Sequence, residues 1–200
     1  TRSSAASDVY KRQLLDRVED SNSGQILIPE MHVDITDELR SKAKALASVV
    51  GDSLWQQLPT VDTLLPVSNN TADLILGMNW QPSLCVIGAD GLPSVQAAGN
   101  VLRTNTDLKL SFRIPPGVDA DALEPILKEI LEKNPPYGAE VSFLPDSSAN
   151  GFHSPPLEGE AKRAITEASM QLTGRPPLAT WIGGTIPFMA MMQSLSLIHI

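Results

Sequence analysis

The sequence predicts a mixed α/β fold, built as a sandwich in which helices cover one face of a small sheet. Two segments, 108–114 and 139–143, alternate apolar and polar residues with the two-residue period of a strand. Two others, 36–50 and the stretch ending at Leu131, space their apolar residues as a helix does. Pro-rich and Gly-rich turn signals separate these segments.

The first strand and helix are expected between residues 25 and 51. The segment 25–35 is predicted to form one or two short strands, because its apolar residues alternate and Pro29 interrupts them. Thr36 is placed to cap a helix, since its hydroxyl can accept an N–H bond from the first turn. Gly51 is expected to end that helix.

The sequence over 52–81 is expected to form an irregular insertion with a short helix. The apolar run from Pro82 to Gly88 then predicts a strand. The run contains the single cysteine, Cys85, which excludes an internal disulfide and is expected to be a buried structural thiol. Cysteine usage of this kind fits a reducing compartment, so a cytoplasmic location is expected.

The central strand is expected to carry Phe112 on its buried face and Arg113 on its polar face. Asp119 or Asp121 is then predicted to cap a helix with an apolar stripe, which needs a sheet to cover it. The segment 139–143 supplies the last strand. The order strand, helix, strand, strand, helix, strand is that of a ferredoxin-like βαββαβ sandwich.

A second region follows this sandwich. A loop over 151–156 leads into a helix over 157–172 that is expected to end at Gly174, and a strand is predicted at 177–182. The sequence Gly183-Gly184-Thr185 then turns into an apolar helix that begins near Pro187, a residue suited to the first helical position.

Composition excludes several classes of partner. The chain has 200 residues, 42% of them hydrophobic, and a formal charge of −8, so it can form a globular core. No cluster of Lys and Arg offers the basic stripe that a nucleic acid needs. No run of about 18 apolar residues predicts membrane insertion.

Three features could carry chemistry. The Gly183-Gly184-Thr185 turn before a helix start can bind a carboxylate or an oxyanion through backbone N–H groups, or it can be a tight connection without a ligand. His153, in a Pro/Gly-rich loop, can donate a hydrogen bond to a developing oxyanion, or it can be a solvated loop residue. Arg113 can grip a carboxylate in a bidentate pair, or it can be an ordinary exposed strand arginine.

The two ends look foreign to the protein. Residues 3–13 and the final LSLIHI resemble peptides that arise when sequencing adapter is translated together with a coding read. We therefore expect 1–13 and 194–200 to be artefacts and expect a longer parent protein, which removes His199 from the candidate ligands. With only His32, interpreted as structural, and His153 remaining, this chain alone is not predicted to bind catalytic zinc.

Several stretches, in this order, resemble the zinc aminoacyl-peptidase family that includes carnosinase, cytosolic nonspecific dipeptidase and acetylornithine deacetylase. They are Trp80-Gln81-Pro82-Ser83-Leu84, Gly99-Asn100-Val101-Leu102, Leu110-Ser111-Phe112-Arg113-Ile114-Pro115, the His153 loop and Trp181-Ile182-Gly183-Gly184-Thr185-Ile186-Pro187. The resemblance implies that 14–150 form a ferredoxin-like lid, with an insertion at 52–81, through which two copies dimerise. It also implies that 151–193 are part of a zinc-binding catalytic domain.

The resemblance further implies roles for single residues. Arg113 would grip the substrate carboxylate, and His153 would be catalytic by polarising the scissile carbonyl. Gly183, Gly184 and Thr185 would contact the C-terminal carboxylate of the substrate, and Asn100 stands where dipeptidases have a threonine that reaches the partner's site. Zinc and its ligands would belong to the complete parent. A partner-subunit histidine expected before Trp80 is missing, which puts carnosine-like specificity in doubt.

Two interpretations therefore compete. In the first, the chain is an inactive piece of a metallopeptidase that hydrolyses the amide bond of dipeptides or acyl amino acids. In the second, it is a self-contained ferredoxin-like dimerisation or binding module without catalysis. The first predicts exposed apolar residues near the C-terminus, such as Phe188, Met189 and Met192, and the second predicts that this segment is packed.

Overall fold

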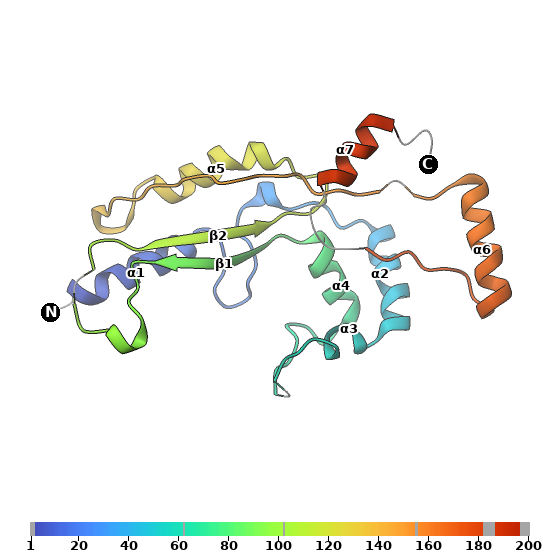
Figure 1. Ribbon diagram of the computed structural model, residues 1–200, viewed down its shortest axis with the longest axis horizontal. Helices are drawn as coiled ribbons and strands as arrows, with labels where there is room; N and C mark the ends of the chain where they lie inside the picture. Colours follow the sequence, from blue (N-terminus) through green and yellow to red (C-terminus); the bar gives the residue numbers. More distant parts are fainter. Residues whose placement is uncertain (1–2, 62, 102, 155, 182–186, 197–200) are drawn as a thin grey trace. The chain divides into compact units, whose positions relative to one another are not determined.

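The computed structural model describes residues 3–61, 63–101, 103–154, 156–181 and 187–196 (Figure 1). These residues form a mixed fold of helices and one small antiparallel sheet, as predicted. They divide into two compact units. Unit 1 comprises Thr1–Val33 and Pro82–Gly151, and unit 2 comprises Asp34–Gln81 and Phe152–Ile200. Within the described ranges, no helix has both the length and the apolar character needed to span a bilayer.

The sheet of unit 1 pairs β1 (Ser83–Asp90) with β2 (Asp107–Arg113). Leu84 lies opposite Phe112, and both pack against the core of the unit. Arg113 lies opposite Ser83 and is exposed. The two-residue alternation therefore separates an inner apolar face from an outer polar face, as β2 was predicted to do.

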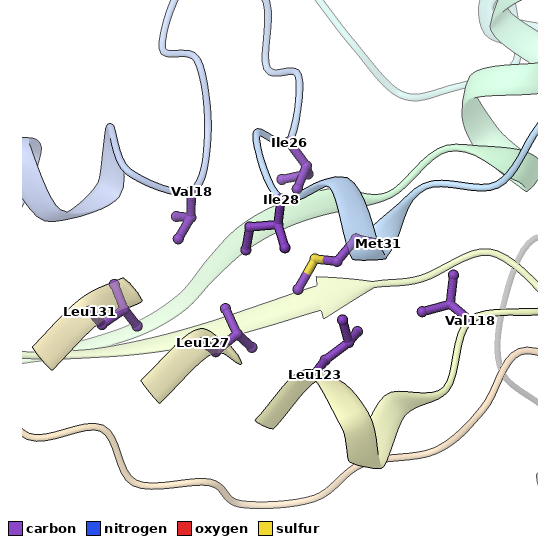
Figure 2. Close-up of a cluster of buried hydrophobic side chains, with 8 residues drawn as sticks. All are labelled: Val18, Ile26, Ile28, Met31, Val118, Leu123, Leu127 and Leu131. Atoms are coloured by element: carbon purple, nitrogen blue, oxygen red, sulfur yellow. The ribbon is translucent and has the colours of Figure 1, made fainter. Parts of the chain in front are cut away.

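The core of unit 1 lies between α5 (Ala120–Glu132) and the segment before Val33. Asp119 caps α5, because its carboxylate accepts the N–H of Asp121 at 3.1 Å. Three leucines of α5 point toward Ile28 and Met31 (Figure 2). The buried cluster consists of Val18, Ile26, Ile28, Met31, Val118, Leu123, Leu127 and Leu131.

Arg17 joins the two chain segments of unit 1 at the C-terminal end of α5. Its guanidinium donates hydrogen bonds to the carbonyl oxygens of Ile130 at 2.9 Å, Lys133 at 2.7 Å and Asn134 at 2.7 Å. The last carbonyls of a helix have no partner within the helix, and a cation stabilises them. Arg17 thus completes the end of α5 from a distant part of the sequence.

The prediction of one or two strands over 25–35 is wrong, because this segment adds no strand to the sheet. Ile26 forms only an isolated bridge with Glu19, and Pro29–Met31 is a short 3₁₀ helix. Pro29 has no N–H for a ladder, so the chain turns there while Ile26 and Ile28 remain buried. The Nε2–H of His32 donates a hydrogen bond to the carbonyl oxygen of Ile26 at 2.8 Å, which agrees with its structural interpretation.

The last predicted strand of the sandwich, 139–143, also forms no strand pairing among the described residues. Its burial alternates as predicted, with Val141 and Phe143 partly buried. The N–H of Phe143 donates instead to the Glu132 side chain at 2.7 Å, and Lys109 of β2 contacts Asp146 at 2.6 Å. The six-element ferredoxin-like order is therefore not observed, and the sheet of the described residues has two strands.

The prediction for Cys85 is wrong, because this residue is exposed. It lies opposite Ser111, on the face of the sheet that also carries Lys109 and Arg113. The apolar run around it suggested a strand covered on both faces. Only the opposite face, which carries Leu84, is turned toward packed side chains, so Cys85 meets solvent.

Three further helical segments lie in unit 1. Helix α1 (Ser3–Leu15) lies in the segment that was expected to be adapter-derived, and the ring of Tyr10 lies 5.3 Å from that of Tyr137. Short 3₁₀ helices occur at Val95–Ala97 and Pro136–Gly138. Gly91 follows β1 with φ +77° and approaches the backbone of Asn105, so a side chain would not fit there.

Unit 2 begins with α2 (Asp37–Val50), as predicted. Thr36 caps it by accepting the N–H of Leu39 at 3.3 Å, and Gly51 ends it. One short helix was expected within the insertion 52–81, and the structure has two helices there, α3 (Ser53–Gln56) and α4 (Thr71–Trp80). Helix α4 packs against α2 and is apolar on most of its surface, so its sequence shows no clear helical period. Asn70 caps it by accepting the N–H of Ala72 at 3.0 Å.

The C-terminal part of unit 2 contains α6 (Gly159–Thr173) and α7 (Pro187–Ser196). Gly174, with φ +70°, ends α6, and α7 begins at Pro187, both as predicted. The strand predicted at 177–182 is absent over 177–181, and residue 182 lies outside the described residues. Helix α6 has no buried residue.

Candidate functional site

His153 lies in the loop that opens the second segment of unit 2, where two aromatic residues join it. The centroid of its ring is 5.1 Å from that of Trp80, with the ring planes at 75°. Trp80 in turn contacts Trp181 edge-to-face, at 5.8 Å and 87°. Three distant positions of the sequence therefore meet at one indole, at the C-terminal residue of α4.

The three rings differ in exposure, and the most buried ring is the one that the protein holds in a fixed position. Only 7% of Trp80 is exposed, whereas His153 is exposed and Trp181 is half-buried. Edge-to-face contacts at such separations stabilise by about 0.5–1.5 kcal/mol beyond the burial of their area. The buried Nε1 of Trp80 has no hydrogen-bond partner, which costs about 1–3 kcal/mol. Trp80 is therefore held by packing and by its ring contacts.

A carboxylate also lies near His153. Glu38, in the first turn of α2, pairs with Lys42 at 2.6 Å. The hydrogen bond and the charge of Lys42 lower the pKa of Glu38, and a positive charge on His153 lowers it further. The exposed imidazole thus contacts an aromatic ring and lies within reach of the charge of Glu38, and its exposure leaves it able to hydrogen-bond a ligand.

The predicted substrate-binding residues of unit 1 lie on its surface. Arg113 is the exposed last residue of β2, and Asn100 is exposed in the connection between the two strands. Gly183, Gly184 and Thr185 lie outside the described residues. The structure thus brings His153 together with Trp80 and Trp181 within unit 2, while the grouping of Arg113 with His153 in one site stays a prediction.

The residues described do not fit a catalytic metal. In the ranges that the structure covers, no three His, Cys, Asp or Glu side chains lie close enough to hold an ion. A catalytic zinc needs about three protein ligands and an open position. The described residues therefore support no chemical step through the zinc that the family resemblance implies.

Sequence reasoning found His153 but missed the aromatic residues around it. Trp80 and Trp181 were noted only as parts of longer stretches, 80–84 and 181–187. The sequence contains only three tryptophans, and two of them stand immediately before Gln81-Pro82 and Ile182-Gly183. A large aromatic residue at the edge of a glycine or proline turn is a signal that could have marked them.

No protein-family model matches the chain, and no curated protein matches it. Solved structures do. Human carnosine dipeptidase 1 matches with a TM-score of 0.61 and 21% identity over 94% of this chain and 40% of that one. The dipeptidase Dug1p of Saccharomyces cerevisiae matches with a TM-score of 0.60 and 21% identity, covering 93% of this chain and 39% of that one.

The third match is the M20 family metallo-carboxypeptidase Sso-CP2 of Sulfolobus solfataricus, with a TM-score of 0.57 and 19% identity over 90% of this chain and 45% of that one. The chain spans less than half the length of all three structures. At these identities the similarity establishes the fold alone, and the fold of this chain is that of one part of each of these three structures.

Proposed function

We propose that this chain is a part of a longer peptidase of the dipeptidase and acyl-amino-acid hydrolase type, and that it contributes substrate-contacting residues but no metal ligands. One observation carries the proposal: 94% of the chain matches 40% of human carnosine dipeptidase 1. A fold alone does not fix an activity. The activity is therefore argued from His153 and Arg113 and is open to test.

Exposed apolar residues in unit 2 support a partial chain over a self-contained module. Phe188 is 61% exposed and Met189 41% exposed, and α6 has no buried residue. Apolar surface of this kind is normally covered in a complete protein. The alternative, a ferredoxin-like module without catalysis, needs this segment to be packed.

Within the proposed enzyme, the residues of this chain bind and orient the substrate. Arg113 would hold a substrate carboxylate in a charge-assisted pair, because its guanidinium is exposed at the end of a strand and Pro115 limits the backbone after it. His153 would donate a hydrogen bond to the scissile carbonyl from its exposed position in the loop. The Gly183-Gly184-Thr185 sequence and Asn100 would contact the rest of the substrate.

The same proposal covers the dimer, the metal, the substrates and the cellular location of the complete protein. Two copies would pair through a lid of residues 14–150, and residues 151–193 would belong to the catalytic domain. Zinc would be held by residues of the complete parent. The substrates would be dipeptides or acyl amino acids, and the enzyme would act in the cytoplasm.

The test starts from the coding sequence that flanks this chain in its source DNA. The proposal requires a His-x-Asp segment upstream and a further histidine downstream. The complete protein would then be assayed on a panel of dipeptides and acyl amino acids. A flanking sequence without these residues, or a complete protein that hydrolyses no compound of the panel, would overturn the proposal.

A matched pair of variants tests the role of Arg113 in that protein. Arg113→Ala should lower kcat/KM by about tenfold or more through loss of a charge-assisted pair. Lys109→Ala, on the same face of β2, is the control and should change it far less. Equal kinetics for the two variants would show that Arg113 does not bind substrate.

A further inference from the structure

Two segments of unit 2 that the proposed function places at the substrate have one anchor in common. The loop of His153 reaches Trp80 through its imidazole. The segment that ends at Trp181 reaches the same indole from a different part of the sequence. Trp181 precedes Gly183 by two positions, so whatever fixes Trp181 also fixes the point from which the glycine turn starts.

Trp80 is fixed by more than these two contacts. It is the last residue of α4, which packs against α2 and buries Ala72, Ile75 and Leu76 on the same helix. Asn70 caps the other end of α4. A residue that is 7% exposed at the end of a capped and packed helix keeps one position, whereas exposed loop residues keep theirs only through contacts.

The two contacts reach Trp80 separately. One ring contact runs from His153 to Trp80, and the other runs from Trp181 to Trp80. Glu38 faces His153 from α2 and adds a charge interaction that an aromatic ring does not supply. Trp80 is thus the member common to both contacts.

We propose that Trp80 is a positioning residue that holds both His153 and Trp181, two positions before Gly183 in the sequence, in the places that they take beside a substrate. This inference rests on the proposed function only where it speaks of a substrate. The claim that Trp80 fixes the positions of His153 and Trp181 does not depend on that function. The indole offers a large rigid surface to both partners. Its N–H has no acceptor, so the ring surface, and not a hydrogen bond, is what positions the two segments.

The experiment records the imidazole signals of His153 by NMR in the full chain, without substrate. The chain has three histidines, and His153→Ala identifies the signals. The ring current of Trp80 should displace them from the positions of free histidine. Trp80→Leu should return them to those positions, and Trp80→Phe should keep much of the displacement because a ring remains.

The Trp181 indole signals provide the second half of the test. They should move in Trp80→Leu but stay in place in His153→Ala, because the two contacts with Trp80 are separate. Trp181→Leu should likewise leave His153 in place. Trp55→Leu is the matched control, since Trp55 lies in the same unit but lines an apolar cavity of about 190 Å³ with Leu58 and Met78.

Each outcome decides the proposal. His153 signals that stay displaced in a folded Trp80→Leu chain would overturn it, as would Trp181 signals that move as far in His153→Ala as in Trp80→Leu. If Trp80→Leu does not fold, Trp80→Phe carries the test: the smaller ring must reduce the displacement of His153, and an unchanged displacement overturns the proposal. Because no substrate is used, an absence of peptidase activity in the complete protein leaves this result standing.

Discussion

Helices α5 and α6 were both predicted from the sequence, α5 from its apolar stripe and α6 as a helix that ends at Gly174, yet only α5 is packed. Helix α5 buries Leu123, Leu127 and Leu131 against the core of unit 1. Helix α6, of similar length, buries nothing, and its Leu172 is 85% exposed. Periodicity therefore predicts that a helix forms, but what its apolar face covers depends on partners that the periodicity does not reveal.

The substitution with the largest expected effect on this contrast is Leu127→Ala in α5. Leu127 belongs to the buried cluster, and removal of a buried leucine side chain leaves a cavity. The free energy of unfolding of unit 1 should fall by about 2–5 kcal/mol. Urea unfolding followed by circular dichroism measures it, and a change below about 1 kcal/mol would show that the cluster is not tightly packed.

A second test concerns the end of α5. Arg17→Met removes three hydrogen bonds to carbonyls at and just after the C-terminal end of α5 while keeping an apolar stem. Because these bonds are charge-assisted, the free energy of unfolding should fall by about 1.5–3 kcal/mol. The exposed Arg40→Met in α2 is the control and should stay within about 0.5 kcal/mol. An equal loss of unfolding free energy in the two variants would show that it comes from removing a positive charge and not from the hydrogen bonds of Arg17.

A third test uses α6 itself. Ile165 is 49% exposed, so Ile165→Ala should change stability by no more than about 0.5 kcal/mol. Amides of α6 should also exchange hydrogen with solvent much faster than those of α5, because few buried contacts hold this helix. Equal protection of the two helices would contradict the contrast and favour the self-contained module.

The smallest expected effect is a dependence on pH at the outer face of the sheet. The hydrogen bond and charge of Lys109 lower the pKa of Asp146. A carboxyl whose pKa is lower in the folded state stabilises above its unfolded value, about 3.9, and that contribution is lost as the pH falls through the folded value. The protection of the 139–149 amides, measured relative to the intrinsic exchange rate at each pH, should therefore fall below about pH 4, and Asp146→Asn should remove this dependence. The pair is exposed, so added salt should weaken it.

The sequence was sufficient for elements that local chemistry determines. Thr36 and Gly51 mark the ends of α2, Asp119 marks the start of α5, and the alternation around Phe112 marks β2. The elements that failed depend on partners. Residues 139–143 have the alternation of a strand but no paired neighbour among the described residues.

The candidate site was predictable to the same limited degree. The residue type and loop setting of His153 marked it, and strand alternation placed Arg113 on an exposed face. The meeting of Trp80, His153 and Trp181 joins positions far apart in the chain, and no local pattern encodes such a contact. The one short helix expected over 52–81 was given no bounds, and α4, which carries Trp80, shows no clear helical period because its sequence is apolar on most sides.

The hydrogen bond from Arg17 to the carbonyl of Asn134 joins residues 117 positions apart, which has a consequence for how the chain folds. Long-range closure of this kind costs entropy before any contact repays it, and it slows folding. During synthesis, the N-terminal segment must wait until Asn134 has left the ribosome. Until then, Val18, Ile26 and Ile28 have no α5 to cover them, so we expect the nascent chain to be most prone to aggregation in that interval.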